Sequence, residues 1–185
     1  IAAQEALGKP SQVVVPAALQ ANYAKERKKH LIGKKQPAEI VSLQNIARKR
    51  LPPSKPVMIV DEAHRAREPQ TAAYDTLRKN TAEKRLLLTG SPFYNHPADI
   101  APLIDIVAGT KIMPTKRDEF SAKYISDRRV SPGLLGKLRG IEPGVEQGVN
   151  PKMKGELQRI FKKWVDYHPS STEDFPSVSR EDVRV

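Results

Sequence analysis

Short apolar runs alternate with helical segments through the first half of the chain. Four runs rich in Val, Ile and Leu predict strands, at residues 13–15, 39–41, 57–60 and 85–88. Runs of this kind are typical of strands that are buried on both faces of a sheet. Helix-forming segments separate them, so the predicted fold class is α/β, a doubly wound parallel sheet with right-handed crossovers and helices on both faces.

The second half of the chain is predicted to be mostly helical. Pro97 begins an amphipathic helix that ends at Gly109. Thr115, followed by Asp118, predicts a capping box at the start of another helix. Pro151 begins a third helix, whose apolar residues recur at helical spacing. The strand pattern is absent from this region.

These patterns divide the chain into three parts. Residues 1–109 form the α/β domain, residues 110–168 form a helical extension, and residues 169–185 form a linker rich in Ser, Thr and Pro that runs into a strand. Within the extension, residues 130–149 are interrupted by Gly and Pro, which predicts irregular structure.

Positive charge is concentrated in two regions. The chain of 185 residues has a formal net charge of +11. Ten Lys or Arg and two Glu lie between Lys25 and Lys55, an excess of eight positive charges. Residues 128–163 contain nine basic and three acidic residues, an excess of six. Such regional excesses suit a polyanionic partner, most simply nucleic acid, although a solubilising surface has the same composition.

The composition excludes several classes of site. There is no cysteine, which excludes disulfides and thiolate metal sites, and the four histidines are scattered. No segment approaches the roughly 18 apolar residues of a membrane span, and no signal-peptide pattern opens the chain. We therefore expect a soluble intracellular protein of the cytoplasm, nucleoid or nucleus, without a membrane partner.

The candidate chemistry follows the third apolar run directly. Asp61, Glu62 and His64 come after Val57–Val60, and ligands bind at the carboxyl ends of strands in open α/β sheets. An aspartate there can hold hydrated Mg²⁺, and a neighbouring glutamate can orient or deprotonate an attacking water. A solvated acidic turn would contain the same residues, so the pair alone leaves both interpretations open.

In combination, four stretches resemble the first RecA-like lobe of superfamily II helicases, in the Swi/Snf-like group of DNA translocases. Asp61–His64 is similar to the DEAH form of motif II, and Arg85–Pro92 with Asn95 is similar to motif III. Val13–Leu19 resembles motif Ia, and Val41–Gln44 resembles the short DNA-contacting segment before motif II. The resemblance implies a partial RecA-like sheet followed by a mostly helical extension.

The resemblance also implies that parts of a motor are missing. The family's phosphate loop, Gly-x-x-x-x-Gly-Lys-Ser/Thr, occurs nowhere in the chain, and Ile1–Leu7 resembles the tail of the helix that follows this loop. We therefore expect a fragment that begins just after the phosphate loop and that works with the second RecA-like lobe of the same protein. The fragment alone is expected not to hydrolyse ATP, because it lacks the groups that hold the phosphates.

By this resemblance the intact protein is an ATPase that uses ATP and Mg²⁺. The implied roles are that Asp61 holds Mg²⁺ through water, Glu62 activates the hydrolytic water, and His64 passes the nucleotide state to motif III. The coupling residues implied in motif III are Thr89, Gly90, Ser91 and Asn95.

The same resemblance implies contacts with the DNA backbone that do not depend on base sequence. The residues implied are Pro16, Ala17, Ser42 and Gln44, and the nearby basic cluster adds Lys25, Lys28 and Lys29. The implied function is ATP-dependent movement along DNA. Two alternatives stay open: a non-catalytic DNA- or protein-binding remnant of a helicase, and the motor subunit of a restriction enzyme.

Overall fold

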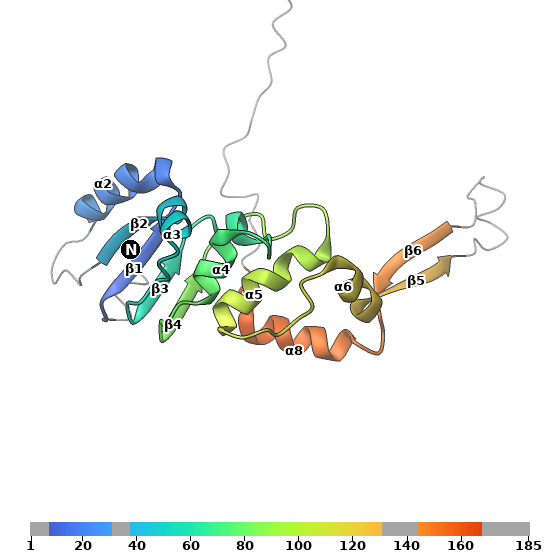
Figure 1. The fold of residues 1–185 in the computed structure, drawn as a ribbon. Coiled ribbons are helices and arrows are strands. Elements are labelled where there is room, and N and C mark those ends of the chain that lie inside the picture. The colour runs from blue at the N-terminus through green and yellow to red at the C-terminus, as the bar shows by residue number, and fades with distance from the viewer. Residues whose placement is uncertain (1–7, 31–37, 131–143, 168–185) are drawn as a thin grey trace, which may run out of the picture.

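A four-stranded parallel sheet forms the centre of the computed structural model, which describes residues 8–30, 38–130 and 144–167. The order across the sheet is β2 (Ala38–Ser42), β1 (Ser11–Val15), β3 (Val57–Val60) and β4 (Lys84–Leu87), as Figure 1 shows. Every neighbouring pair of strands is parallel. The four predicted strands and their parallel arrangement are confirmed.

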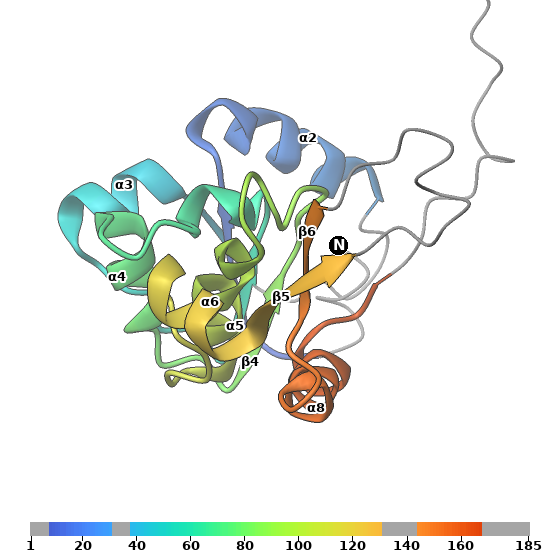
Figure 2. The same ribbon diagram turned by 90° about the vertical axis from the view of Figure 1, so that its right-hand side faces the viewer.

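Helices cover both faces of this sheet, because side chains alternate between the faces along each strand. Val14, Met58 and Val60 pack on one face, under α3 (Leu43–Lys49), α4 (Ala72–Arg78) and α5 (Ala101–Ala108). Val13 and Ile59 pack on the other face, where Tyr23 of α2 (Gln20–His30) covers them. Figure 2 shows α2 on the opposite side of the sheet from α3 and α4.

The path of the chain makes the boundary between β1 and β3 a topological switch point. From β1 the chain passes through α2 to β2, whereas from β3 it passes through α4, on the opposite face, to β4 on the other side of the sheet. Ligands in open α/β sheets bind where neighbouring connections diverge in this way. The Asp61 amide donates to the Val14 carbonyl at 2.9 Å, so the acidic residue lies beside the end of β1.

A second apolar core joins the C-terminal helices to this domain. It contains the 3₁₀ turn η3 (Pro97–Ile100), α6 (Arg117–Tyr124) and α8 (Lys154–Trp164). Phe120 and Tyr124 are buried there against Phe161 and Trp164. The predicted helices of the extension are therefore confirmed, and the aromatic residues of α8 form part of a core.

A hairpin in the extension corrects one prediction. The antiparallel strands β5 (Ile125–Val130) and β6 (Gly144–Val149) pair where irregular structure without strands is predicted, and they project from one end of the molecule (Figure 1). Strand β5 continues directly from α6 without a turn signal. The two strands are also separated along the chain, so no local pattern marks their pairing.

The capping box predicted at Thr115 and Asp118 is wrong. Helix α6 begins after Lys116, and no side chain caps it. The structure forms a capping box earlier, between His96 and Asp99 at the start of η3. A histidine is an unusual N-cap residue, so the sequence pattern does not reveal it.

Residues 1–7 and 169–185, predicted to be a helix tail and a linker, lie outside the described residues. The domain boundaries at 109 and 168 stay predictions. Of the helices that the structure describes, none has both the length and the apolar character needed to span a membrane.

Candidate functional site

The acidic pair lies in the turn that leaves β3. The amide of Glu62 donates to Oδ1 of Asp61 at 3.0 Å. Glu62 has left-handed backbone angles, φ 52 and ψ 45, which non-glycine residues seldom adopt. The next amide, of Ala63, donates to the Leu88 carbonyl at 2.9 Å and fastens this turn to the end of β4. Backbone conformations of this kind persist where surrounding contacts impose them, and they cluster at functional sites.

His64 connects the acidic pair to the loop after β4. It lies in the 3₁₀ turn η2 (Ala63–Ala66). Its Nδ1 is 3.1 Å from Oγ1 of Thr89 and 3.2 Å from Oε2 of Glu62. The side chain of Glu62 is 42% exposed and that of His64 is 26% exposed, so both face solvent and not an apolar core. The structure thus brings together residues that the sequence places in two separate motifs.

The other residues of the predicted coupling loop have different surroundings. The Ser91 amide donates to Oγ1 of Thr89 at 3.1 Å, which orders the loop. A Cβ added at Gly90 would meet no atom within 4 Å, so local packing does not require a glycine there. Asn95 lies with the capping box instead: its Oδ1 accepts from Arg117 at 2.8 Å, and its amide donates to Asp99 at 3.1 Å.

One residue of α2, Tyr23, lies within electrostatic reach of the acidic pair, and sequence reasoning missed it. Burial raises the pKa of Tyr23 above its ordinary value of 10.0, the positive charge of Arg27 lowers this pKa, and the negative charge of Asp61 raises it. The charges of Arg27 and Asp61 therefore act on the Tyr23 hydroxyl in opposite directions. The available signal was the spacing of four residues between Tyr23 and Arg27, which puts them on one face of the helix.

The two predicted DNA-contacting segments meet at the same edge of the sheet. The Ala17 amide, just after β1, donates to Oε1 of Gln44 on α3 at 2.9 Å, and both residues are exposed. Pro16 and Ser42 are buried. The Ser42 hydroxyl accepts from the Asn45 amide at 3.0 Å and caps α3, as its sequence position predicts. Ala17 and Gln44 are therefore accessible to a ligand, whereas the other two residues hold the segments in place.

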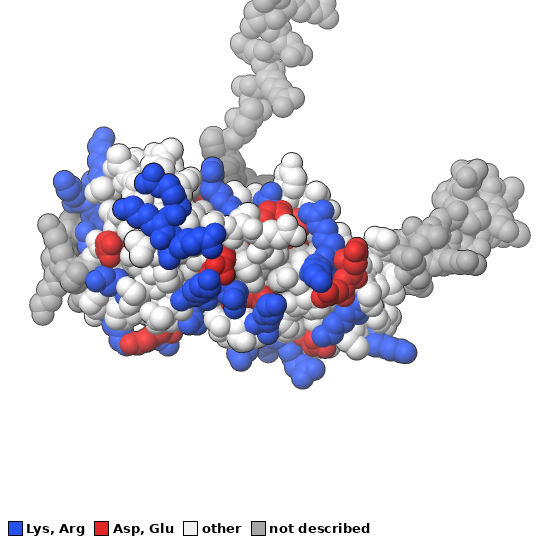
Figure 3. Space-filling model, viewed as in Figure 1, with Lys and Arg blue, Asp and Glu red and all other residues white. Residues whose placement is uncertain are grey.

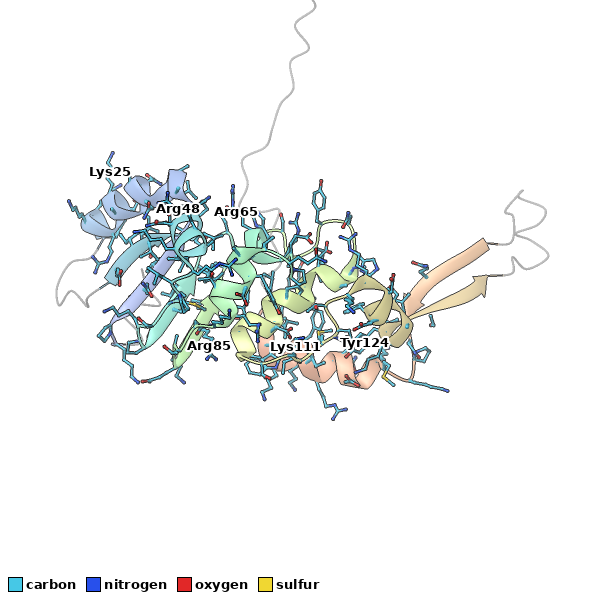
Figure 4. The ribbon with its side chains drawn as sticks, viewed as in Figure 1. Lys25, Arg48, Arg65, Arg85, Lys111 and Tyr124 are labelled. Carbon is cyan, nitrogen blue, oxygen red and sulfur yellow. The ribbon has the colours of Figure 1, made fainter. Side chains whose placement is uncertain are left out.

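Basic side chains line this edge from three elements. Lys25, Lys28 and Lys29 are exposed on α2. Arg48 of α3 and Arg65 of η2 are also exposed, and Figure 4 shows them along the same upper edge as Lys25. Figure 3 shows basic side chains gathered over this end of the molecule. Arg65 was not predicted, because it lies beyond the basic run in the sequence and reaches the surface only through the fold.

The acidic pair suits a hydrated magnesium ion. Mg²⁺ keeps several waters and is usually held by one or two carboxylates together with substrate phosphates. Asp61 and Glu62 offer such carboxylates at a partly exposed edge. Over the ranges that the structure covers, no group of three or more His, Cys, Asp or Glu could enclose a metal ion. The described residues therefore fit a metal that arrives with a phosphate ligand.

Comparison with known proteins identifies the fold around this site. Residues 54–141 match the SNF2-related domain, and this range includes both the acidic pair and the Thr89 loop. This stretch, just under half of the chain, is therefore similar to an SNF2-related domain. The Swi/Snf-like resemblance of its sequence is therefore confirmed. The segments around Ala17 and Gln44 lie before the matched range.

Relatives of this chain are much longer proteins. It is 27% identical over 104 residues to chromodomain-helicase-DNA-binding protein 1-like of Danio rerio, which covers 56% of this chain and 10% of that protein. It is 25% identical over 124 residues to protein CHROMATIN REMODELING 5 of Arabidopsis thaliana, which covers 58% of this chain and 7% of that protein. The chain thus spans a tenth or less of the length of these relatives.

A solved structure confirms the fold class. The SWI2/SNF2 ATPase core of Sulfolobus solfataricus in complex with dsDNA matches with a TM-score of 0.55 and 21% identity. The match covers 88% of this chain and 34% of that chain. The predicted RecA-like sheet with helices on both faces is therefore the fold of this chain.

Proposed function

We propose that the intact protein is an ATP-dependent DNA translocase and that this chain belongs to its first motor lobe. The observation that carries the proposal is the link from Glu62 through His64 to Thr89 at the carboxyl edge of the sheet. A turn that is merely acidic and solvated does not require side-chain contacts with the next loop. The names of the relatives, which include helicases that bind DNA and remodel chromatin, support the same function.

The proposed reaction is the hydrolysis of ATP. Asp61 would hold Mg²⁺ through water, and the metal when bound would neutralise charge on the phosphates. Glu62 orients the attacking water and accepts its proton, as a partly exposed carboxylate at this edge can do. His64 is placed to sense the state of Glu62, because one ring nitrogen faces both the carboxylate and the Thr89 hydroxyl.

The proposed track is the backbone of duplex DNA. Gln44 and Ala17 are exposed where β1 and α3 meet, and both α2 and α3 carry exposed basic side chains. Phosphate contacts grip DNA without reading its sequence, which suits movement along it. In this proposal the chain works with a second RecA-like lobe. The protein is located where DNA is found, in the nucleoid or nucleus.

The test measures ATP hydrolysis and DNA binding by the full-length protein. We expect duplex DNA to stimulate hydrolysis. Reversing the charge of Lys25, Lys28 and Lys29 to Glu should flatten the slope of log affinity against log salt by about 0.9 for each DNA phosphate that the variant no longer neutralises. The matched control reverses three exposed lysines of the distant extension: Lys152, Lys154 and Lys162.

The outcomes separate the proposal from its alternative. A greater flattening of the salt slope in the α2 variant than in the control supports the basic track. DNA binding without any ATP turnover by the full-length protein would identify a non-catalytic remnant. An unchanged salt slope in the α2 variant would contradict the proposed DNA surface.

A further inference from the structure

A cation–π contact joins the two loops of the site at a second point, and the proposed function does not use it. The Cζ atom of Arg67 lies 4.6 Å from the centre of the Tyr94 ring. Arg67 follows the turn that contains His64, and Tyr94 lies in the loop that begins at Thr89. Tyr94 is 75% exposed, so burial in an apolar core does not hold its ring. The contact with the Arg67 guanidinium therefore contributes strongly to the position of the Tyr94 ring.

Both partners of this contact are anchored through their backbones. The Arg67 amide donates to the His64 carbonyl at 3.2 Å, which fixes Arg67 to the turn of the acidic pair. The Tyr94 amide donates to Oδ2 of Asp99 at 3.1 Å, which fixes Tyr94 to the start of η3. A side-chain contact between two anchored residues constrains the separation of the segments that contain them.

The position of Arg67 favours the ring over its other neighbour. Its Nε lies 3.9 Å from Oε1 of Glu68, whose side chain is 60% exposed. An exposed ion pair at such a distance contributes little. The Arg67 side chain is only 22% exposed, so the guanidinium lies against the protein and does not extend into solvent. Guanidinium groups stack well on aromatic faces.

We propose that Arg67 and Tyr94 are positioning residues for the coupling of ATP hydrolysis to DNA. Their stack holds the Thr89 loop where the Thr89 hydroxyl can meet His64, which the structure places at 3.1 Å. The inference rests on the proposed function, because only a motor has a nucleotide state to transmit through this hydrogen bond. Neither Arg67 nor Tyr94 acts on the reacting atoms.

The test uses the full-length protein and measures the ratio of kcat with saturating duplex DNA to kcat without DNA. Tyr94→Leu keeps an apolar side chain and removes the aromatic face, so it should lower this ratio about threefold, the effect of removing an exposed cation–π interaction. Tyr94→Phe keeps the ring and should keep the ratio. Phe93→Leu is the matched control, because it removes an aromatic ring from the same loop. Phe93 lines a cleft of about 400 Å³ beside α6 and α8, so this change should keep the ratio.

Arg67 supplies an independent arm of the experiment. Arg67→Gln should lower the ratio as much as Tyr94→Leu does, and the double variant should lower it no further, because both changes remove the same interaction. Full DNA stimulation in Tyr94→Leu would overturn the inference. An equal loss in Tyr94→Phe would also overturn it, because the hydroxyl would then matter and not the ring face.

The failure of this inference differs from the failure of the proposed function. If the wild-type protein is stimulated by DNA and Tyr94→Leu is stimulated equally, only the positioning role is refuted. If duplex DNA leaves the hydrolysis rate of the wild-type protein unchanged, the proposed function fails and the positioning role fails with it.

Discussion

Asp99 fastens the loop between β4 and η3, and its replacement should destabilise the protein strongly. Its side chain is only 5% exposed. Oδ2 accepts hydrogen bonds from the amides of Tyr94 at 3.1 Å, Asn95 at 3.1 Å and His96 at 3.3 Å. Oδ1 accepts from Nη2 of Arg117 at 3.3 Å. One carboxylate therefore serves most of the donors in this loop.

The magnitude follows from what these donors lose. A hydrogen bond to a charged group contributes about 1.5–3 kcal/mol, and a buried group without a partner costs about 1–3 kcal/mol. The three amides share one oxygen, and water can replace part of what is removed, so the separate effects do not add. We expect Asp99→Ala to lower the free energy of unfolding by about 3–4 kcal/mol. Asp99→Asn keeps an acceptor oxygen and should lower it by about 1–2 kcal/mol.

The effect of Asp99 should depend on pH in a defined direction. Burial would raise the pKa of Asp99, but the amides of Asn95, Tyr94 and His96 and the charge of Arg117 outweigh burial and hold the pKa below its ordinary value of 3.8. Because the pKa is lower in the folded than in the unfolded protein, the ionised carboxylate stabilises the fold. This contribution is complete above the ordinary pKa and is lost as the pH falls through it towards the folded value.

The assay is equilibrium unfolding in urea, at neutral pH and in acid. The difference in unfolding free energy between wild type and Asp99→Asn should shrink as the pH falls. Asp118→Asn, an exposed change in the first turn of α6, is the control and should shift stability by no more than about 0.5 kcal/mol. An Asp99→Ala variant within about 1 kcal/mol of wild type at neutral pH would refute this account of the loop.

Two further substitutions test the end of α5. Gly109 has φ 75, and a Cβ at this position would lie 2.9 Å from Nη1 of Arg85. Gly109→Ala should therefore lower the free energy of unfolding by about 1–2 kcal/mol. An unchanged Tm would contradict the backbone strain inferred at Gly109. Burial raises the pKa of Asp105, although hydrogen bonds from the Ile112 amide and the Tyr74 hydroxyl lower it. A raised folded pKa means that Asp105 stabilises the fold in acid and that this stability is lost as the pH rises through the folded pKa. Asp105→Asn, which resembles the protonated form, should therefore be at least as stable as wild type at neutral pH, and a large loss in urea unfolding would show that the charge is needed.

Local signals in the sequence are sufficient for the parallel sheet. The run from Val57 to Val60 is apolar on both sides, and the structure buries all four of these residues between two layers of helices. Ser42 is a good N-cap at the end of a strand, and it caps α3. These features depend on neighbours in the chain, which a periodic pattern reports directly.

Features that depend on distant residues were not predictable in this way. The β5–β6 hairpin pairs two segments that are separated along the chain. Asn95 resembles part of a coupling motif, yet Arg117, far along the chain, binds its side chain. The Arg67–Tyr94 contact likewise requires two loops to converge. In each case the residue type allows several partners, and only the tertiary fold selects one.

The central claim is that Asp61 and Glu62 form the hydrolytic end of a nucleotide site. Single-turnover ATP hydrolysis by the full-length protein carrying Glu62→Gln tests this claim most directly, with Glu68→Gln as a control on a nearby side chain that is 60% exposed. Loss of a positioned general base should slow hydrolysis by about 100-fold or more while ATP still binds, and the control should hydrolyse normally. Hydrolysis by Glu62→Gln at the wild-type rate would contradict the claim.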